Sequence, residues 1–258
     1  NRFIGKSSIK KPKYIIQGMK KLKILLIIPS YNEEENILKV YKEIQKSKQD
    51  IDYVYINDGS TDNSLKIFKE NNLNYINLVH NLGIGGAVQT GYKYALENDY
   101  DIAIQFDGDG QHDINYVETI CKPIIDGEAD FVIGSRYLDD TTSGFKSTFM
   151  RRLGKNIISV MIKWFWKQKI TDPTSGFRAG NKEVIKNFAK EYPSDYPEPE
   201  STVTLLKLGY KVTERPVNMK EREAGESFAN AWTSCLYMLK VSLAIIVDSI
   251  FRRNGGKK

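Results

Sequence analysis

The stretch Ile102-Ala-Ile-Gln-Phe-Asp-Gly-Asp-Gly-Gln-His112 is a short apolar run that ends in two carboxylates, Asp107 and Asp109. The apolar run predicts a buried β-strand, and the glycine between the acids would let both side chains turn toward one point. Two hard oxygen donors at the carboxyl end of a buried strand suit Mg²⁺ or Mn²⁺ carrying a phosphate-bearing substrate. Such a pair can also be a plain polar turn, so the surrounding sequence has to decide between the two interpretations.

On both sides of this strand the sequence alternates between strand and helix patterns. The expected strands are 24–28, 51–56, 75–79, 102–106 and 131–134, and the expected helices between them are 33–45, 64–69, 85–97 and 114–126. Alternating elements with short connections predict an α/β fold with a mostly parallel central sheet and helices on both faces. The later elements that we expect are helices over 149–167, 182–190 and 201–208 and a strand over 211–217.

The long helix predicted over 149–167 has an apolar stripe. Its members are Leu153, Ile157, Val160, Met161, Trp164 and Phe165. The simplest explanation of such a stripe in an α/β domain is a helix face packed on the core, so we expect the stripe to be buried.

A second apolar helix is expected over 231–251, followed by a basic end. Lys240 and Asp248 interrupt it, and its apolar runs are shorter than the roughly 20 residues that a membrane-spanning helix needs. An amphipathic helix that lies at the membrane surface fits this pattern better.

Composition and charge narrow the class of protein further. The chain has 258 residues, 41% of them hydrophobic and 27% charged, which is ordinary for a globular protein. The net charge of +6 suits a polyanionic partner, and the concentration of basic residues at the two ends favours a membrane surface over nucleic acid. The two cysteines, Cys121 and Cys235, are far apart and predict no disulfide framework, which favours a reducing compartment.

Polar residues follow four consecutive predicted strands. The segments are Pro29-Ser-Tyr-Asn-Glu-Glu34, Asn57-Asp-Gly-Ser-Thr-Asp62, His80-Asn-Leu-Gly-Ile-Gly-Gly86 and Asp107-Gly-Asp109. In an open α/β sheet these loops form the ligand crevice. The glycine segment is no dinucleotide fingerprint, because Val88 stands where a third Gly or Ala belongs, and no Walker-type Gly-Lys-Ser/Thr follows it.

The order of motifs resembles that of family-2 glycosyltransferases. The motifs are Pro-Ser-Tyr-Asn-Glu-Glu, Asn-Asp-Gly-Ser-Thr-Asp, Asn-x-Gly-x-Gly, Asp-x-Asp-x-Gln-His, Gly-Ser-Arg and Thr-Ser-Gly-Phe-Arg, within a likeness that runs from Lys23 to Ser227. They are most similar to the branch of dolichyl-phosphate mannose synthases and bacterial cell-surface polysaccharide transferases. The resemblance implies a GT-A fold, a nucleotide-diphosphate sugar donor (UDP- or dTDP- favoured), Mg²⁺ or Mn²⁺, and inversion at the anomeric carbon.

The resemblance also implies roles for individual residues. The positions that would bind the nucleotide are Pro29, Tyr31, Glu33, Asp58, Gly83, Gly85 and Asp107. The positions that would hold the metal against the diphosphate are Asp107, Asp109 and Gln111. The positions that would bind phosphate are Arg136, Arg152 and Arg222. For His112, a site role and a purely structural hydrogen bond both stay open.

A catalytic carboxylate is expected in the Pro-rich segment 192–200, near the place where the family has its catalytic acid. Glu200 is our first choice and Glu198 the second, in addition to Asp109 in the acidic loop. An acid at a helix start can instead simply stabilise the helix dipole. An acceptor that is already a phosphate needs no base, and the acid would then orient the substrate.

The sequence therefore predicts an inverting, metal-dependent glycosyltransferase with a lipid-linked acceptor, acting in cell-surface polysaccharide or glycoconjugate synthesis. A polyprenyl-phosphate sugar synthase is the nearest alternative. A sugar-1-phosphate nucleotidyltransferase fits less well, because the loop over 31–34 has neither a Gly-rich segment nor a basic residue. A glycoside hydrolase would need no nucleotide site, and a non-catalytic scaffold would have no use for the acid pair.

Domain limits and location follow from the same patterns. We expect a basic extension over 1–18 that is not native, because Met19 stands directly before the first strand. The catalytic domain would cover 19–229, and an amphipathic helix with a basic tail would cover 230–258. The expected location is cytoplasmic, peripheral on the inner face of the cell membrane, with a second copy or a small membrane protein as possible partners and no nucleic acid.

Overall fold

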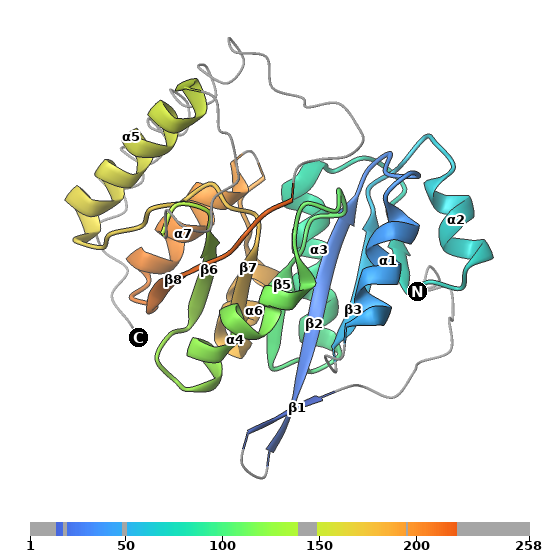
Figure 1. Ribbon diagram of the computed structural model, residues 1–258, viewed down its shortest axis with the longest axis horizontal. Helices are drawn as coiled ribbons and strands as arrows, with labels where there is room; N and C mark the ends of the chain where they lie inside the picture. Colours follow the sequence, from blue (N-terminus) through green and yellow to red (C-terminus); the bar gives the residue numbers. More distant parts are fainter. Residues whose placement is uncertain (1–13, 18–19, 48–50, 139–148, 195, 221–258) are drawn as a thin grey trace.

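The computed structural model describes residues 14–17, 20–47, 51–138, 149–194 and 196–220 (Figure 1). Its strands are β1 (Tyr14–Gln17), β2 (Lys20–Ser30), β3 (Asp52–Asn57), β4 (Tyr75–Asn77), β5 (Ile102–Gln105), β6 (Phe131–Ser135), β7 (Arg178–Asn181) and β8 (Val212–Pro216). Its helices are α1 (Ile37–Lys46), α2 (Ser64–Glu70), α3 (Gly83–Glu97), the short 3₁₀ helix η1 (Ile114–Tyr116), α4 (Val117–Ile125), α5 (Phe149–Trp166), α6 (Lys182–Lys190) and α7 (Pro197–Lys207). The predicted alternation of strand and helix is confirmed.

The strands form one twisted sheet in the order β4-β3-β2-β5-β7-β6-β8, with β1 paired to β2 off this path. Pairings along the order are parallel except for those of β7, which runs antiparallel to both β5 and β6. The mostly parallel sheet is as predicted, but β1 and β7 were not expected. Strand β7 is only Arg-Ala-Gly-Asn, too short for a periodic pattern, and its partners lie far away in the sequence.

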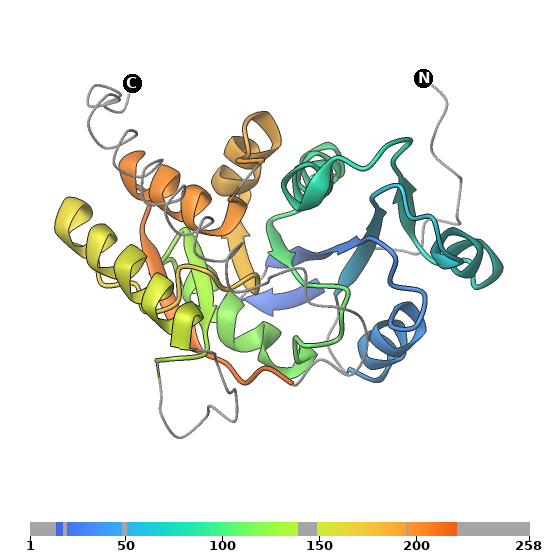
Figure 2. The same ribbon diagram turned by 90° about the horizontal axis from the view of Figure 1, so that it is seen from above.

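Helices cover both faces of the sheet (Figure 2). Residues 24–28 of β2 are completely buried, and their side chains alternate between the two layers. Leu25 and Ile27 pack on one side with α3 and α6, whereas Ile24, Leu26 and Ile28 pack on the other with α1 and α4. A strand that is buried on both faces explains why its sequence reads as one unbroken apolar run.

The apolar stripe of α5 is exposed, so the prediction that it packs in the core is wrong. Leu153, Ile157, Val160, Trp164 and Phe165 have between 40% and 72% of their surface accessible. The buried residues are Ile158 and Ile162, on the opposite face, and Met161 is partly buried against the core. Figure 2 shows the reason: α5 lies at the outer edge of the molecule, so only one of its faces meets the rest of the described structure.

Helix α7 starts earlier than expected. It begins at Pro197, not at residue 201, so Glu198 and Glu200 lie inside its first turn rather than ahead of it. A proline is well suited to the first position of a helix, because the amide hydrogen that it lacks would have no partner there. This start places two carboxylates at the positive end of the helix dipole.

Several expectations concern residues outside the described ranges. They include the helix over 231–251, the basic tail, Arg222 and residues 1–13 of the extension. The domain limits therefore stay predictions. Among the helices that the structure describes, none is both long and apolar enough to cross a bilayer.

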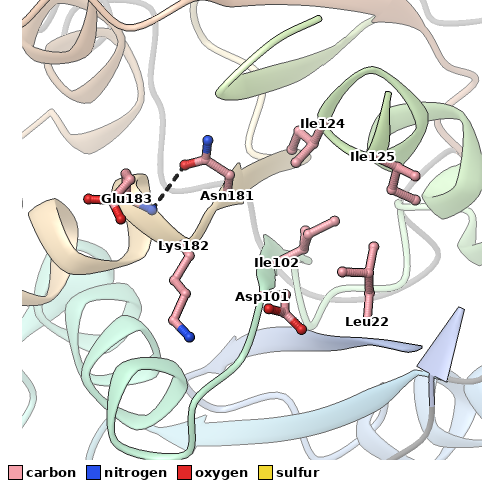
Figure 3. Close-up of a pocket in the computed structure, with 8 residues that line it drawn as sticks. All are labelled: Leu22, Asp101, Ile102, Ile124, Ile125, Asn181, Lys182 and Glu183. Atoms are coloured by element: carbon pink, nitrogen blue, oxygen red, sulfur yellow. Dashed lines mark hydrogen bonds between the residues drawn. The ribbon is translucent and has the colours of Figure 1, made fainter. Parts of the chain in front are cut away.

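One open depression of about 220 Å³ lies between the starts of β2 and β5, and Leu22, Ile102, Ile124 and Lys182 are among its lining residues (Figure 3). Ile102 is the first residue of β5, whereas Asp107 follows the last. The depression is thus at the opposite end of the strands from the acidic loop.

Candidate active site

The loops after β2 and β3 are tied together at the carboxyl edge of the sheet. Asn32 adopts the left-handed conformation, with φ of 53°, and its side-chain oxygen accepts a hydrogen bond from the backbone amide of Thr61 at 2.8 Å. In return, its own backbone amide donates to the Ser60 hydroxyl at 3.0 Å. Glu34 and Asp62 form a similar reciprocal set, in which each side chain accepts from backbone amides of the other loop. The rim that carries Tyr31 and Glu33 is therefore fixed before any ligand binds.

Asp58 connects β3 to the glycine loop. Its buried carboxylate accepts a hydrogen bond from the amide of Leu82 at 2.7 Å. Burial raises the pKa of Asp58, and the amides of Leu82 and Gly83 partly offset that rise. One carboxylate oxygen of Asp58 thus fixes the loop that precedes α3, whether or not Asp58 also contacts a nucleotide.

The two glycines predicted to approach the nucleotide have different surroundings. Gly83 has φ of +73° and open space where a side chain would be. At Gly85 a Cβ atom would lie 2.3 Å from the carbonyl oxygen of Pro193, so this glycine lets α3 pack against the segment that precedes α7. Gly83 is thus required by its backbone conformation and Gly85 by close packing, and the sequence pattern alone could not distinguish these two reasons.

Glycines also shape the acidic loop after β5. A Cβ atom at Gly108 would lie 2.8 Å from the carbonyl oxygen of Pro29 and 2.9 Å from the Ser30 hydroxyl, so a larger residue would push the loop away from β2. Gly110 has φ of +77°, and the Asp109 carboxylate accepts from the Gln111 amide at 3.0 Å. The acidic loop therefore packs closely against β2, and Gly108 lies next to the carbonyl group of Pro29.

His112 positions the carboxylate of Asp107. Its buried ring accepts the amide hydrogen of Asp107 at Nδ1 (3.0 Å), and Nε2 lies 3.3 Å from Asp107 Oδ2. Burial lowers the pKa of His112 to about 4, although the charge of Asp109 acts in the opposite direction. The neutral ring with its acceptor at Nδ1 carries its proton on Nε2, the nitrogen that lies near the carboxylate. His112 thus contacts Asp107 with both ring nitrogens, and its role in the site stays a prediction.

Gly176 lies directly against the same carboxylate. A Cβ atom at this position would be 2.6 Å from Asp107 Oδ2 and 3.1 Å from Oδ1. Asp107 is thus supported by His112 on its own loop and by the loop over 172–177, which comes from a distant part of the chain.

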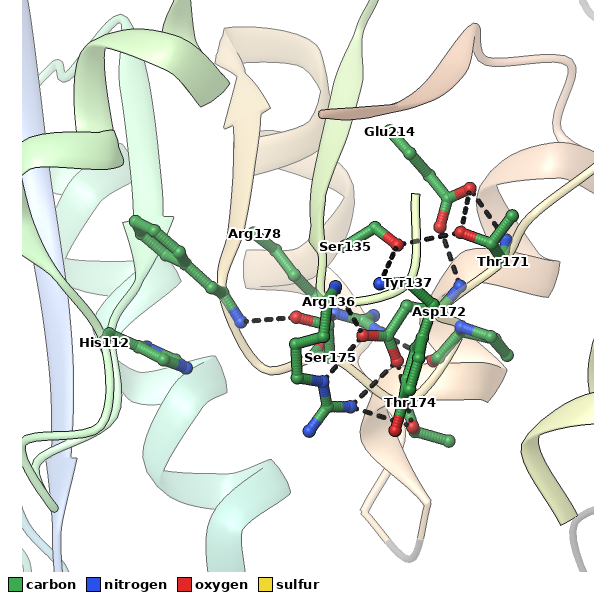
Figure 4. A network of polar contacts seen from close by, with 12 residues as sticks. His112, Ser135, Arg136, Tyr137, Thr171, Asp172, Thr174, Ser175, Arg178 and Glu214 are labelled. Carbon is green, nitrogen blue, oxygen red and sulfur yellow. Dashed lines mark hydrogen bonds and ion pairs between the residues drawn. The ribbon is translucent and has the colours of Figure 1, made fainter. Parts of the chain in front are cut away.

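A polar network fixes Arg136 at the end of β6 (Figure 4). Asp172 binds its guanidinium with both carboxylate oxygens, at 2.7 Å from Nε and 2.8 Å from Nη2. Glu214 in β8 in turn accepts from the amides of Thr171 and Asp172 at 2.7 and 2.8 Å. Burial works to lower the pKa of Arg136, but Asp172, Tyr137 and Asp107 more than compensate and raise it. Arg136 is thus a rigidly held cation within electrostatic reach of Asp107.

Two more cations lie beside Arg136. Lys155 of α5 has its Nζ 4.0 Å from the centroid of the Tyr137 ring, and the guanidinium of Arg136 lies 5.6 Å from the same centroid. Burial lowers the pKa of Lys155, and the positive charges of Arg136 and Arg152 lower it further, against the effect of Asp172 and Glu214. The predicted phosphate ligands Arg136 and Arg152 therefore share one region with Lys155, a residue that no motif of the sequence singled out.

Arg178 is a buried arginine that the sequence reading missed. Its guanidinium donates to the carbonyl oxygens of Pro173 (2.8 Å), Ser175 and Glu198 and to the hydroxyl of Ser201 (2.9 Å). It thus joins the loop that supports Asp107 to the first turn of α7. Its place at the end of the Thr-Ser-Gly-Phe-Arg motif was the available signal, but a sequence motif does not tell which groups an arginine contacts.

Of the two predicted catalytic carboxylates, Glu198 faces the acidic loop. The pKa of Glu198 is raised, mainly because the carboxyl group is buried, and the charge of Asp107 raises it further. The guanidinium of Arg178 and the side chain of Gln105 offset part of this rise. Residues two apart on a helix are separated by about 200° around its axis, so Glu200 points away from the side that Glu198 occupies.

The donor atoms of the acidic loop fit a hard divalent cation. Asp107 contacts the His112 ring, and the negative charge of Asp109 raises the pKa of the same ring, so both carboxylates lie in the neighbourhood of His112. Within the described ranges, no cluster of three or more His, Cys, Asp or Glu side chains has a metal-binding arrangement. A metal held here would need further oxygen ligands, which a diphosphate and water can supply. The Gln111 side chain, the third predicted ligand, donates to the carbonyl oxygen of Lys220 at 3.3 Å.

Comparison with known proteins places this site in a family. The sequence profile of the family described as glycosyl transferase family 2 matches residues 25–188, which carry the acidic loop, Arg136 and the motif that ends in Arg178. The chain belongs to glycosyl transferase family 2. Most of the loops that bring the site together thus lie inside the matched region, whereas Glu198 and Glu214 follow it.

Two relatives in the family are similar over most of the chain. A UDP-N-acetylglucosamine–dolichyl-phosphate N-acetylglucosaminyltransferase from Methanococcus voltae is 34% identical over 65% of this chain and 73% of its own length. A polyprenol monophosphomannose synthase from Mycolicibacterium smegmatis is 26% identical over 79% of both.

A solved structure shows the same fold. Glucosyl-3-phosphoglycerate synthase from Mycobacterium tuberculosis, in complex with Mn²⁺, uridine diphosphate and glucosyl-3-phosphoglycerate, superimposes with a TM-score of 0.60 at 15% identity over 88% of this chain and 79% of that chain. The family-2 protein therefore has the GT-A fold that its motif order predicted.

Proposed function

We propose that this family-2 glycosyltransferase moves a sugar from a nucleotide diphosphate, preferably uridine diphosphate, to the phosphate of a polyprenyl-type lipid. The observation that carries the proposal is Arg136, a cation held by Asp172 within electrostatic reach of the acidic loop. A second anion that binds at Arg136 would lie beside a donor diphosphate held at Asp107. The two relatives named for dolichyl-phosphate and polyprenol substrates support a lipid phosphate as that anion.

The donor side is assigned to the acidic loop. Asp107 and Asp109 would hold Mg²⁺ or Mn²⁺, which neutralises the charge that builds on the leaving diphosphate. The related synthase, solved with Mn²⁺ and uridine diphosphate, supports this choice of metal and nucleotide. His112 keeps the Asp107 carboxylate in one orientation, and the fixed loops around Tyr31 and Asp58 offer a preformed rim for the base and ribose.

The acceptor side is assigned to the cluster of Arg136, Arg152 and Lys155. The planar guanidinium of an arginine suits the oxygens of a phosphate, and a nearby lysine adds charge without fixed geometry. A lipid phosphate arrives already ionised, so its oxygen can attack the anomeric carbon without a base. In that case Glu198 would orient the sugar rather than remove a proton.

The proposed function is tested with a short-chain, water-soluble polyprenyl phosphate and a panel of nucleotide-diphosphate sugars. We expect sugar transfer to the phosphate in the presence of Mn²⁺ or Mg²⁺ and none to the matching polyprenol without phosphate. Transfer to the alcohol, or release of free sugar with no transfer, would contradict the assignment of Arg136 and its neighbours to an acceptor phosphate.

A comparison of two glutamates tests the assignment of the orienting acid. Glu198→Gln should lower kcat/KM by about 10–100-fold, because a charged contact to the sugar is lost beside the reacting centre. Glu200→Gln removes a charge from the same helix turn and controls for the helix dipole. We expect that variant to stay within about threefold of wild type. The reverse order of the two effects would restore Glu200 as the functional acid.

Location is part of the proposal. A lipid acceptor requires the enzyme to work at a membrane, and we propose the cytoplasmic face, where nucleotide sugars are available. The catalytic domain would be the predicted unit 19–229, with its binding groups on the loops at the carboxyl edge of the sheet.

A further inference from the structure

Helix α5 has an apolar face that nothing in the described part of the molecule covers. Leu153, Ile157, Val160 and Trp164 are spaced four, three and four residues apart, so they form a single line along the helix. Each is exposed, and Trp164 has 72% of its surface accessible. Contiguous large apolar side chains of this kind on a protein surface mark an interaction site rather than ordinary surface.

The charged residues beside this face indicate what kind of partner it binds. Phe149–Trp166 contains no acidic residue at all, and the exposed cations Arg152, Lys163, Lys167 and Lys169 lie on α5 or just after it. Positions 152 and 163 fall on the same flank of the apolar line, at about 90–110° from its centre by helix geometry. An apolar line with basic residues beside it and an exposed tryptophan on it suits the headgroup region of an anionic bilayer. A second copy of the same face would instead bring these cations together.

Helix α5 lies between its exposed apolar face and the cationic cluster at Arg136. The face of α5 turned toward the protein carries Lys155, which lies over Tyr137 next to Arg136. The outer face carries the apolar line, and α5 lies at the edge of the molecule in both views (Figures 1 and 2). One helix therefore has the cationic cluster on one side and a lipid-compatible surface on the other.

We propose that the face formed by Leu153, Ile157, Val160, Trp164 and Phe165 docks on an anionic membrane surface and thereby brings a lipid phosphate to Arg136 and Lys155. The inference rests on the proposed lipid acceptor for its purpose, but docking itself can be measured without any substrate. It assigns membrane contact to α5, a helix inside the folded unit.

The test is flotation with vesicles made of equal parts phosphatidylglycerol and phosphatidylcholine. The wild-type chain should float with them, less so at high salt and much less with pure phosphatidylcholine. The double variant Val160→Glu/Trp164→Glu should lower the partition coefficient at least about tenfold, since two carboxylates would enter the apolar region. Both side chains are exposed, so the variant should keep the wild-type Tm and its turnover of the water-soluble acceptor.

The matched control is Val79→Glu/Leu96→Glu, which adds the same charge at exposed apolar positions away from α5. We expect it to float like the wild type. Equal losses of flotation in both double variants would mean that the added negative charge alone weakens binding. Unchanged flotation of the α5 variant would mean that another segment, such as 231–251, docks on the membrane. Either result overturns the proposal, as would a wild-type chain that ignores anionic vesicles.

A fluorescence measurement covers the case in which the double variant fails to fold. Brominated lipids should quench the tryptophan emission of the wild type, and Trp164→Phe should remove most of that quenching while flotation persists. Quenching that is unchanged in Trp164→Phe would contradict contact between α5 and lipid. A failure of soluble-acceptor turnover in the wild type would instead count against the proposed function and leave the flotation result intact.

Discussion

Replacing Asp109 by Asn is expected to lower the rate of sugar transfer by about a thousandfold or more, with no measurable change in fold. The reason is that an amide is a neutral and weaker ligand for a hard cation than a carboxylate. In the free protein the Asp109 carboxylate accepts a hydrogen bond from the Gln111 amide at 3.0 Å, which an amide oxygen can still accept. The loop should therefore keep its shape while it loses the charge that faces the diphosphate.

The measurement for Asp109→Asn is transfer at saturating donor together with thermal shift by uridine diphosphate, with and without Mn²⁺. In the wild type the metal should add to the stabilisation by the nucleotide, and in the variant that addition should disappear. Asp126→Asn is the matched control, because Asp126 pairs with Lys122 on the surface of α4. Near-normal turnover of Asp109→Asn would remove the metal assignment and, with it, the donor half of the proposed site.

Replacing Arg178 by Leu is expected to have the largest effect on stability, a loss of about 3–5 kcal/mol in the free energy of unfolding. The carbonyl oxygens of Pro173 and Ser175 would lose the arginine donor, and that of Glu198 would keep only the hydroxyls of Ser201 and Thr202. Leucine fills much of the space but offers no hydrogen bond, so the carbonyl groups of Pro173 and Ser175 keep their desolvation cost without this partner. Transfer should fall as well, since Arg178 holds the turn that carries Glu198 against the loop that supports Asp107.

Chemical denaturation at neutral pH measures this loss. Arg215→Leu is the control, because Arg215 is partly exposed and pairs with Glu128 on the surface at 3.3 Å, so its loss should cost less than about 1 kcal/mol. Comparable destabilisation of the two variants would mean that Arg178 contributes no more than a surface arginine, and that the connection between the two loops is maintained by other contacts.

The parts of the fold that local patterns determine could be predicted from the sequence. Residues 24–28 and 102–104 are continuous apolar runs because they are covered on both faces, and that pattern is independent of what covers them. Their common direction places the loops after them at one edge, which is why the acidic loop and the loop at Tyr31 could be assigned to one rim.

The parts that depend on distant contacts could not. Strand β7 is defined by its partners and not by its four residues. The exposure of Trp164 depends on the position of α5 in the molecule, because the helix has apolar residues on two opposite faces. Arg178 and Glu214 are charged residues in buried surroundings, and a sequence pattern gives no sign that distant loops will enclose and pair them.

The contact between Gly176 and the Asp107 carboxylate has a consequence for how such a sequence can change over time. The two residues occupy a single volume although 69 positions separate them, so a side chain at one position is possible only with a different geometry at the other. A longer acid at 107 would meet the backbone at 176, and any side chain at 176 would displace the acid. During evolution, a substitution at position 107 of the Asp-x-Asp segment would therefore require a compensating change at position 176 of the Thr-Ser-Gly-Phe-Arg segment, and the reverse.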